Sequence, residues 1–155
     1  IKEAIDGGIA MSLVIAAATV FSRCLTLLQI PQELATILSA IFTNRYTFLI
    51  GMNVLLLFVG MILDTTSAIL ILTPLLLPMA MSYGIDPYHF GIVMVVNLAI
   101  GFVTPPVGVN LYVASGISGL DIVYIAKKAL PFILTFFVAL LVITFIPQIS
   151  TILVG

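Results

Sequence analysis

Charged residues are rare along this chain, and they separate long apolar stretches. Residues 7–30 and 46–85 each contain a single charged side chain, and residues 88–120 and 130–155 contain none. A helix that crosses a membrane needs about 20 predominantly apolar residues. The pattern therefore predicts an all-α polytopic membrane protein, with room for about four or five membrane elements.

Residues 1–45 are predicted to form a transmembrane helix followed by an amphipathic helix in the membrane interface. The first helix covers residues 7–30, and Pro31 suits the first turn of the second helix. In the second helix apolar residues recur at helical spacing, at Leu34, Ile37, Leu38 and Ile41. One apolar face opposite a polar face is typical of a helix that lies in the interface.

Residues 46–86 are predicted to form a re-entrant helical hairpin. Residues 46–63 and 68–81 are apolar, and the small polar residues 64–67 separate them. This length barely suffices for two spans with a loop. A hairpin tip at membrane depth is tolerated only where protein or a water-filled cavity surrounds it. Two thin spans with the tip at the membrane surface are the alternative.

Residues 87–120 are predicted to form a discontinuous transmembrane helix. Its middle reads GFVTPPVG, in which Pro105 and Pro106 are adjacent. Proline lacks the N–H group and clashes with the preceding turn, and the residue before a proline is pushed toward extended backbone. We therefore expect two half-helices joined by irregular backbone.

This break is expected to free backbone carbonyl groups. Those of Gly101 and Phe102, four residues before the prolines, lose their helical donors close to the Thr104 hydroxyl. A bound Na⁺ would satisfy such carbonyls, because hard cations take oxygen ligands. A proline kink stabilised by neighbouring helices and water is the alternative.

Residues 121–155 are predicted to form an interfacial connector and a final transmembrane helix. Asp121 and the lysine pair at 127 and 128 mark the connector, and residues 130–155 are long enough for a last span. Positive residues favour the cytoplasmic side. Placing these lysines and Lys2 there puts both ends of the hairpin on the outer face. Arg45 is then the one positive residue on the outer side, against this preference.

The tip of the predicted hairpin carries Asp64, the only acidic residue deep in a predicted membrane segment. Such a residue is a functional hypothesis, either as a ligand or as the N-cap of the second arm. Thr65, Thr66 and Ser67 follow it and can also cap a helix. In either role the positive end of the helix dipole faces the membrane centre, which suits an anionic substrate group. Gly60, just before the tip, allows close backbone approach or simple helix packing.

Asn97 lies four residues before Gly101 and seven before Thr104, so the three share one helix face. That face would point at a single cavity. Asn53 and Asn110 are similar single polar residues at membrane depth, and an interhelical hydrogen bond is the role expected for each.

The composition agrees with a membrane protein and excludes other classes. Of 155 residues, 63% are hydrophobic and 7% are charged, whereas a soluble domain carries about 25% charged residues. The net charge of −1 offers no basic surface for a nucleic acid. The single Cys24 excludes an internal disulfide. Because the chain opens with Ile1 and is small for an autonomous transporter, we expect it to be a piece of a larger protein.

Four segments together identify a resemblance to a known family. They are GMILDTTSA at 60–68, TP at 73–74, GIDP at 84–87 and NLAIGFVTPPVG at 97–108. In this order they resemble the large membrane subunit of tripartite ATP-independent periplasmic (TRAP) transporters. The resemblance covers nearly the whole chain, which looks like the C-terminal part of that subunit and the second of its two inverted repeats.

The resemblance implies an elevator-type, Na⁺-coupled importer in the bacterial inner membrane. A periplasmic binding protein would deliver an organic acid, such as sialic acid or a C4-dicarboxylate, and a small membrane subunit would complete the part within the lipid bilayer. The chain would need the remainder of the large permease subunit in order to transport.

The resemblance also implies a Na⁺ site between the hairpin tip and the broken helix. Its carbonyl ligands would come from Gly60, Gly101, Thr104 and Val107, with the Thr104 hydroxyl as a further candidate. The chain would supply half of the substrate cavity, around the hairpin tip and the break, with candidate residues Asp64, Thr65, Thr66, Ser67, Asn97, Pro105 and Pro106.

Two other classes of protein are weighed against a transporter. An intramembrane aspartyl protease needs two carboxylates that share a site, and Asp64 has no such neighbour in a predicted membrane segment, so we expect no enzyme and no catalytic residue. A passive channel subunit would carry solute without a fixed number of Na⁺ ions per turnover. The sequence leaves the organic acid open.

Overall fold

The computed structural model describes residues 42–105 and 108–152, and single positions at 16, 17, 20, 21, 23, 24, 27–29, 33 and 36. The two helices predicted for residues 1–45 therefore lie largely outside the described residues. The rest is all-α, which confirms the predicted fold class, and its helices are α3 (Arg45–Ile62), α4 (Thr65–Ser82), α5 (Pro87–Phe102), α6 (Val109–Ser118), α7 (Ile122–Phe145) and α8 (Pro147–Thr151). Within the described part, α3, α4 and α7 are long and apolar enough to cross a membrane.

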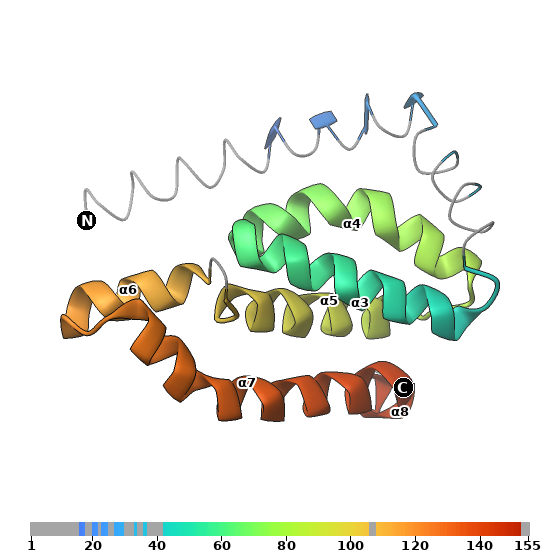
Figure 1. The fold of residues 1–155 in the computed structure, drawn as a ribbon. Coiled ribbons are helices and arrows are strands. Elements are labelled where there is room, and N and C mark those ends of the chain that lie inside the picture. Colours follow the sequence, from blue (N-terminus) through green and yellow to red (C-terminus); the bar gives the residue numbers. More distant parts are fainter. Residues whose placement is uncertain are drawn as a thin grey trace.

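Helix α5 is the centre of the packing. Helices α3 and α4 form a hairpin, and both arms pack against α5, which also contacts α7 and α8. Figure 1 shows that α3 and α5 run in the same direction, and that α6 continues beyond the hairpin tip before α7 returns along the molecule. The hairpin therefore lies alongside α5 and ends near the break between α5 and α6.

Polar side chains that accept from the first turn define where the helices begin. Asn44 and Thr47 form a capping box at α3. Asp64 caps α4, Asp86 caps α5 ahead of Pro87, and Asp121 caps α7. Side-chain caps of this kind satisfy N–H groups that have no partner within the helix. These local signals explain why the hairpin arms and α5 begin at these residues.

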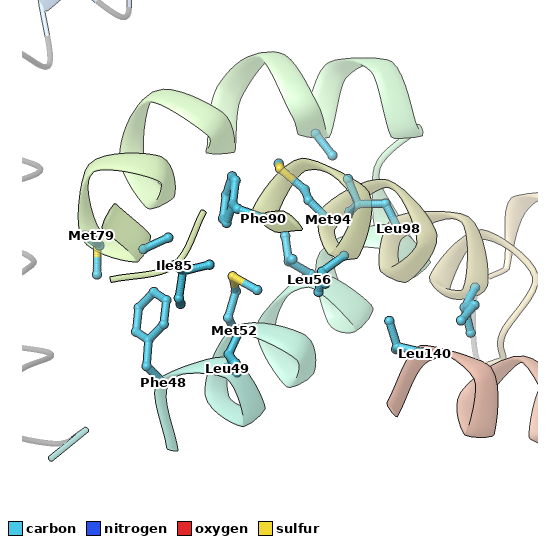
Figure 2. Close-up of a cluster of buried hydrophobic side chains, with 14 residues drawn as sticks. Phe48, Leu49, Met52, Leu56, Met79, Ile85, Phe90, Met94, Leu98 and Leu140 are labelled. Carbon is cyan, nitrogen blue, oxygen red and sulfur yellow. The ribbon is translucent and has the colours of Figure 1, made fainter. Parts of the chain in front are cut away.

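The core is a set of apolar side chains between α3, α4 and α5, with Leu140 added from α7 (Figure 2). On α3 they recur on one face, at Phe48, Leu49, Met52 and Leu56, and on α5 at Phe90, Val93, Met94 and Leu98. In a bilayer, lipid is as apolar as these side chains, so van der Waals packing rather than the hydrophobic effect joins the helices. The facing rows fix which sides of α3 and α5 meet.

The predicted break in the third element is present. Helix α5 ends at Phe102, and α6 begins at Val109 after Gly108, whose φ of +49° is in the left-handed region. A glycine adopts this backbone conformation without steric cost. Pro106 and Val107, two of the predicted site residues, lie outside the described residues.

The final helix differs from the prediction in its bounds. Lys127 and Lys128 lie inside α7 rather than in a connector, because the Asp121 cap starts the helix at Ile122. Helix α7 then ends at Phe145, and Pro147 opens α8. Residues 130–155 therefore do not form one continuous span.

Candidate functional site

The backbones of α3 and α5 touch near the hairpin tip. A Cβ atom on Gly60 would lie 2.7 Å from the Leu98 carbonyl oxygen and 3.3 Å from the Gly101 Cα. A Cβ on Gly101 would lie 2.7 Å from the Leu57 carbonyl oxygen and 2.8 Å from the Gly60 Cα. Both contacts are shorter than a side chain tolerates, so only glycine fits at either position. The structure thus brings together two of the residues predicted for the Na⁺ site.

The end of α5 tightens into a turn at the break. The Thr104 N–H donates to the Gly101 carbonyl at 2.9 Å, and the Thr104 hydroxyl donates to the Ile100 carbonyl at 2.6 Å. The Gly101 carbonyl therefore keeps a hydrogen bond, contrary to the prediction that it loses its donor. The reason is that the last turn closes with i→i+3 bonds, which do not use a proline nitrogen. A carbonyl and a hydroxyl oxygen each retain a lone pair for a cation in this arrangement.

Asp64 caps the second arm of the hairpin. Its Oδ2 accepts from the Ser67 N–H at 3.0 Å, and its side chain is exposed. The capping role predicted for Asp64 is confirmed. Thr66 is exposed beside it, and Thr65 and Ser67 are half-buried. The positive end of the α4 dipole therefore lies at the tip together with small polar side chains.

Asn97 does not open onto the tip. Its side chain is fully buried and donates from Nδ2 to the Asn53 Oδ1 at 2.6 Å, and the Asn53 Nδ2 donates to the Thr144 Oγ1 at 3.1 Å. The interhelical hydrogen bond expected of Asn53 is present. Asn97, which was expected to face a cavity with Gly101 and Thr104, is instead the buried partner of Asn53. Helical side chains lean toward the helix N-terminus, which carries Asn97 away from the break. Asn110, by contrast, is exposed on α6.

The sequence of nearly the whole chain matches that of a known transporter component. A family described as "Tripartite ATP-independent periplasmic transporter, DctM component" matches residues 1–149. The chain belongs to this family. With the apolar helices described above, membership places it in the bacterial inner membrane.

Three curated relatives of this permease chain come from different bacteria. The isethionate TRAP transporter permease protein DctMQ of Oleidesulfovibrio alaskensis is 42% identical over the whole chain. The C4-dicarboxylate TRAP transporter large permease protein DctM of Pseudomonas aeruginosa is 41% identical over 92% of it. The sialic acid TRAP transporter large permease protein SiaM of Vibrio cholerae is 34% identical over 99%. The chain spans 24%, 33% and 36% of these relatives, respectively.

The permease chain contains a second buried polar pair that the sequence did not predict. His89 is fully buried, and its Nδ1 lies 3.1 Å from the Ser150 Oγ. The one signal in the sequence is that His89, Val93 and Asn97 are four residues apart and so share a face of α5. Nothing in the sequence indicated Ser150 as the partner of His89, because the two residues are 61 positions apart.

Proposed function

We propose that this chain supplies one Na⁺ site and half of the substrate cavity of a transporter that imports an organic anion with Na⁺. The observation that carries the proposal is the backbone contact between Gly60 and Gly101, next to Thr104. It gathers peptide oxygens from two helices where no side chain can intervene. Oxygen-rich sites of this kind suit a hard cation.

The ligands of the proposed Na⁺ site are the carbonyl oxygens of Gly60, Gly101, Thr104 and Val107, with the Thr104 hydroxyl as a further candidate. The Thr104 hydroxyl donates its hydrogen bond to the Ile100 carbonyl oxygen. The Thr104 oxygen therefore presents its lone pairs to a cation. A cation shared by α3 and the end of α5 would hold the hairpin tip against the break. Ion binding and the position of the tip would then be coupled.

The substrate side of the proposal rests on the hairpin tip. Isethionate, C4-dicarboxylates and sialic acid, which the relatives' names contain, are all organic anions. The start of α4 offers them a helix dipole and the hydroxyl groups of Thr65, Thr66 and Ser67. The other half of the cavity would come from the remainder of the large permease subunit. A small membrane subunit and a periplasmic binding protein would complete the transporter.

We also propose that the α3–α4 hairpin is re-entrant and moves with α5 as part of an elevator. Its tip lies beside the middle of the α5–α6 element, since Gly60 contacts Gly101 and α6 continues past it (Figure 1). A tip that ends part-way along a membrane-crossing element is at membrane depth. Backbone that is not helical is tolerated there when it faces protein or a water-filled cavity.

The experiment is uptake by proteoliposomes that contain the full-length permease, its small subunit and its binding protein, measured against Na⁺ concentration. Thr104→Ala should raise the Na⁺ concentration for half-maximal uptake by roughly tenfold, because one interaction with a charged group is worth about 1.5 kcal/mol. Thr104→Ser keeps the hydroxyl and should be milder.

The matched control is Thr135→Ala. Thr135 also donates its hydroxyl to the carbonyl four residues earlier, that of Pro131, but it is exposed on α7. It should leave the Na⁺ dependence unchanged. A Na⁺ dependence in Thr104→Ala equal to that of the wild type, at equal protein levels, would contradict the proposed site. Solute flux without Na⁺ coupling would indicate a passive channel.

A further inference from the structure

Buried polar side chains in the described part of the chain form two hydrogen-bonded groups at the helix interfaces. They are Asn53, His89, Asn97, Thr144 and Ser150. One group runs from Asn97 on α5 through Asn53 on α3 to Thr144 on α7, and the other joins His89 on α5 to Ser150 on α8. Each group therefore links α5 to other helices in surroundings that are otherwise apolar.

The bond between Asn97 and Asn53 is the directional contact between α3 and α5. The rest of this interface is apolar, and it includes Met52 and Met94, whose flexible side chains adapt to more than one packing arrangement. The glycine contact at the tip permits close approach in one register, but it adds no hydrogen bond that would hold the two helices in that register. Apolar packing alone therefore leaves the relative position of the two helices weakly specified.

The register of α3 matters at the glycine contact. The neighbours of Gly60 are Val59 and Met61. A shift of one residue moves a helix by about 1.5 Å and turns it by about 100°. Such a shift would direct a side chain at the Leu98 carbonyl, where even a Cβ would lie at 2.7 Å. The close contact at the tip thus exists in one register only.

We propose that Asn53 and Asn97 are positioning residues, whose buried hydrogen bond sets the register of α3 on α5 and so holds Gly60 against Gly101. The inference deepens the proposed Na⁺ site and rests on it for its transport readout. Buried polar pairs contribute little net stability compared with apolar groups of the same shape, but a single buried asparagine can specify the register of packed helices. The pair thus acts on the site through helix position, without contact with the ion.

The test uses leucine, which has nearly the shape of asparagine, in the full-length permease with its partners. Asn97→Leu or Asn53→Leu leaves the other amide buried without its partner, so each single variant should lower the thermal unfolding temperature. Replacement of both partners by apolar groups of the same shape can be nearly neutral. The double variant should therefore regain most of the thermal stability but keep a Na⁺ concentration for half-maximal uptake raised about fivefold, the equivalent of one buried hydrogen bond.

Thr144→Val is the matched control. It removes the hydrogen bond from Asn53 to α7 and leaves the bond between the two asparagines. It should lower thermal stability without changing the Na⁺ dependence. If Thr144→Val shifts the Na⁺ dependence as Asn97→Leu does, or if the double variant recovers both stability and Na⁺ dependence, the positioning role is wrong. Where the double variant does not fold, the comparison of Asn97→Leu with Thr144→Val decides.

A direct measurement of register separates this inference from the proposed function. Spin labels at Phe58 on α3 and Val95 on α5, both exposed, report the distance between the two helices. The double variant should broaden the distance distribution, and Thr144→Val should not. Na⁺-independent uptake by the wild-type protein would refute the proposed function while leaving this measurement to decide the inference. If the double variant has the same distance distribution as the wild type, Asn53 and Asn97 do not set the register of α3 on α5, and the inference is wrong.

Discussion

At the scale of single residues, Asp64 combines a structural role with a position at the hairpin tip. Its carboxylate accepts from the Ser67 N–H and remains exposed. Asp86 and Asp121 cap other helices in the same way. Capping is the role that the structure shows for Asp64.

Substitution of Asp64 separates its cap from its charge. Asp64→Asn should keep uptake and thermal stability, because asparagine caps about as well as aspartate. Asp64→Ala should lower the free energy of unfolding by about 0.5–2 kcal/mol. Asp121→Ala, at the start of α7, should cost a similar amount and leave substrate affinity alone. If Asp64→Asn folds normally but fails in uptake, the charge itself is used.

At the scale of elements, the pairing of α3 with α5 decides the geometry of the site. The two helices run in parallel and touch through Gly60 and Gly101, while the break after Phe102 lets Thr104 turn back onto the last turn of α5. Backbone atoms cannot move aside as side chains do. The contact is therefore sensitive to the addition of one carbon atom.

Gly60→Ala should separate α3 from α5. Its Cβ would lie 2.7 Å from the Leu98 carbonyl oxygen, and we expect a loss of about 1–3 kcal/mol in the free energy of unfolding with reduced uptake. Gly60→Val should be more severe. Gly116→Ala on α6, where an added Cβ meets nothing within 4 Å, should be neutral or slightly stabilising in a helix. Thermal unfolding measures the loss of stability, and proteoliposome uptake measures the loss of transport. If the Gly60 and Gly116 variants behave alike in both measurements, the close contact between Gly60 and Gly101 is absent.

At the scale of the whole molecule, the arrangement has two distinct ends. The start of α3 and the start of α5 lie together with α8 at one end, and α6 and the start of α7 lie at the other (Figure 1). The second end carries Lys127 and Lys128, and the Lys128 Nζ lies 5.8 Å from the centre of the Tyr124 ring. Lysine near the end of a span favours the cytoplasmic side, and tyrosine is common at both membrane interfaces. Arg45 remains at the opposite end.

This orientation predicts how cysteines label in the full-length protein. Cysteines at Arg45 and Asp86 should both react from the periplasmic side, and one at Lys127 only from the cytoplasm. A cysteine at Thr66, exposed at the hairpin tip, should be protected by substrate if the tip faces the cavity. Labelling of Arg45 and Asp86 from opposite sides would eliminate the hairpin. Free labelling of Thr66 from the cytoplasm, insensitive to substrate, would favour two thin spans.

The sequence alone determined the features that act over a few residues. Charge-free stretches predicted the helices, aspartate before a helix predicted the cap at α4, and the two prolines predicted the break. These signals suffice because a helical hydrogen bond reaches four residues, and a proline or a cap acts within the same distance. The pairing of Gly60 with Gly101 came instead from the family resemblance, since no local signal joins residues this far apart.

Only the tertiary structure decided which polar side chains meet. Asn97 finds Asn53 and Thr144, and His89 finds Ser150, because the helices cross at particular heights and angles. A periodic pattern predicts which face of a helix is buried but not the register of that face against another helix. For this reason the sequence placed Asn97 toward a cavity beside Gly101, whereas packing of α3 against α5 turned it into a buried link between helices.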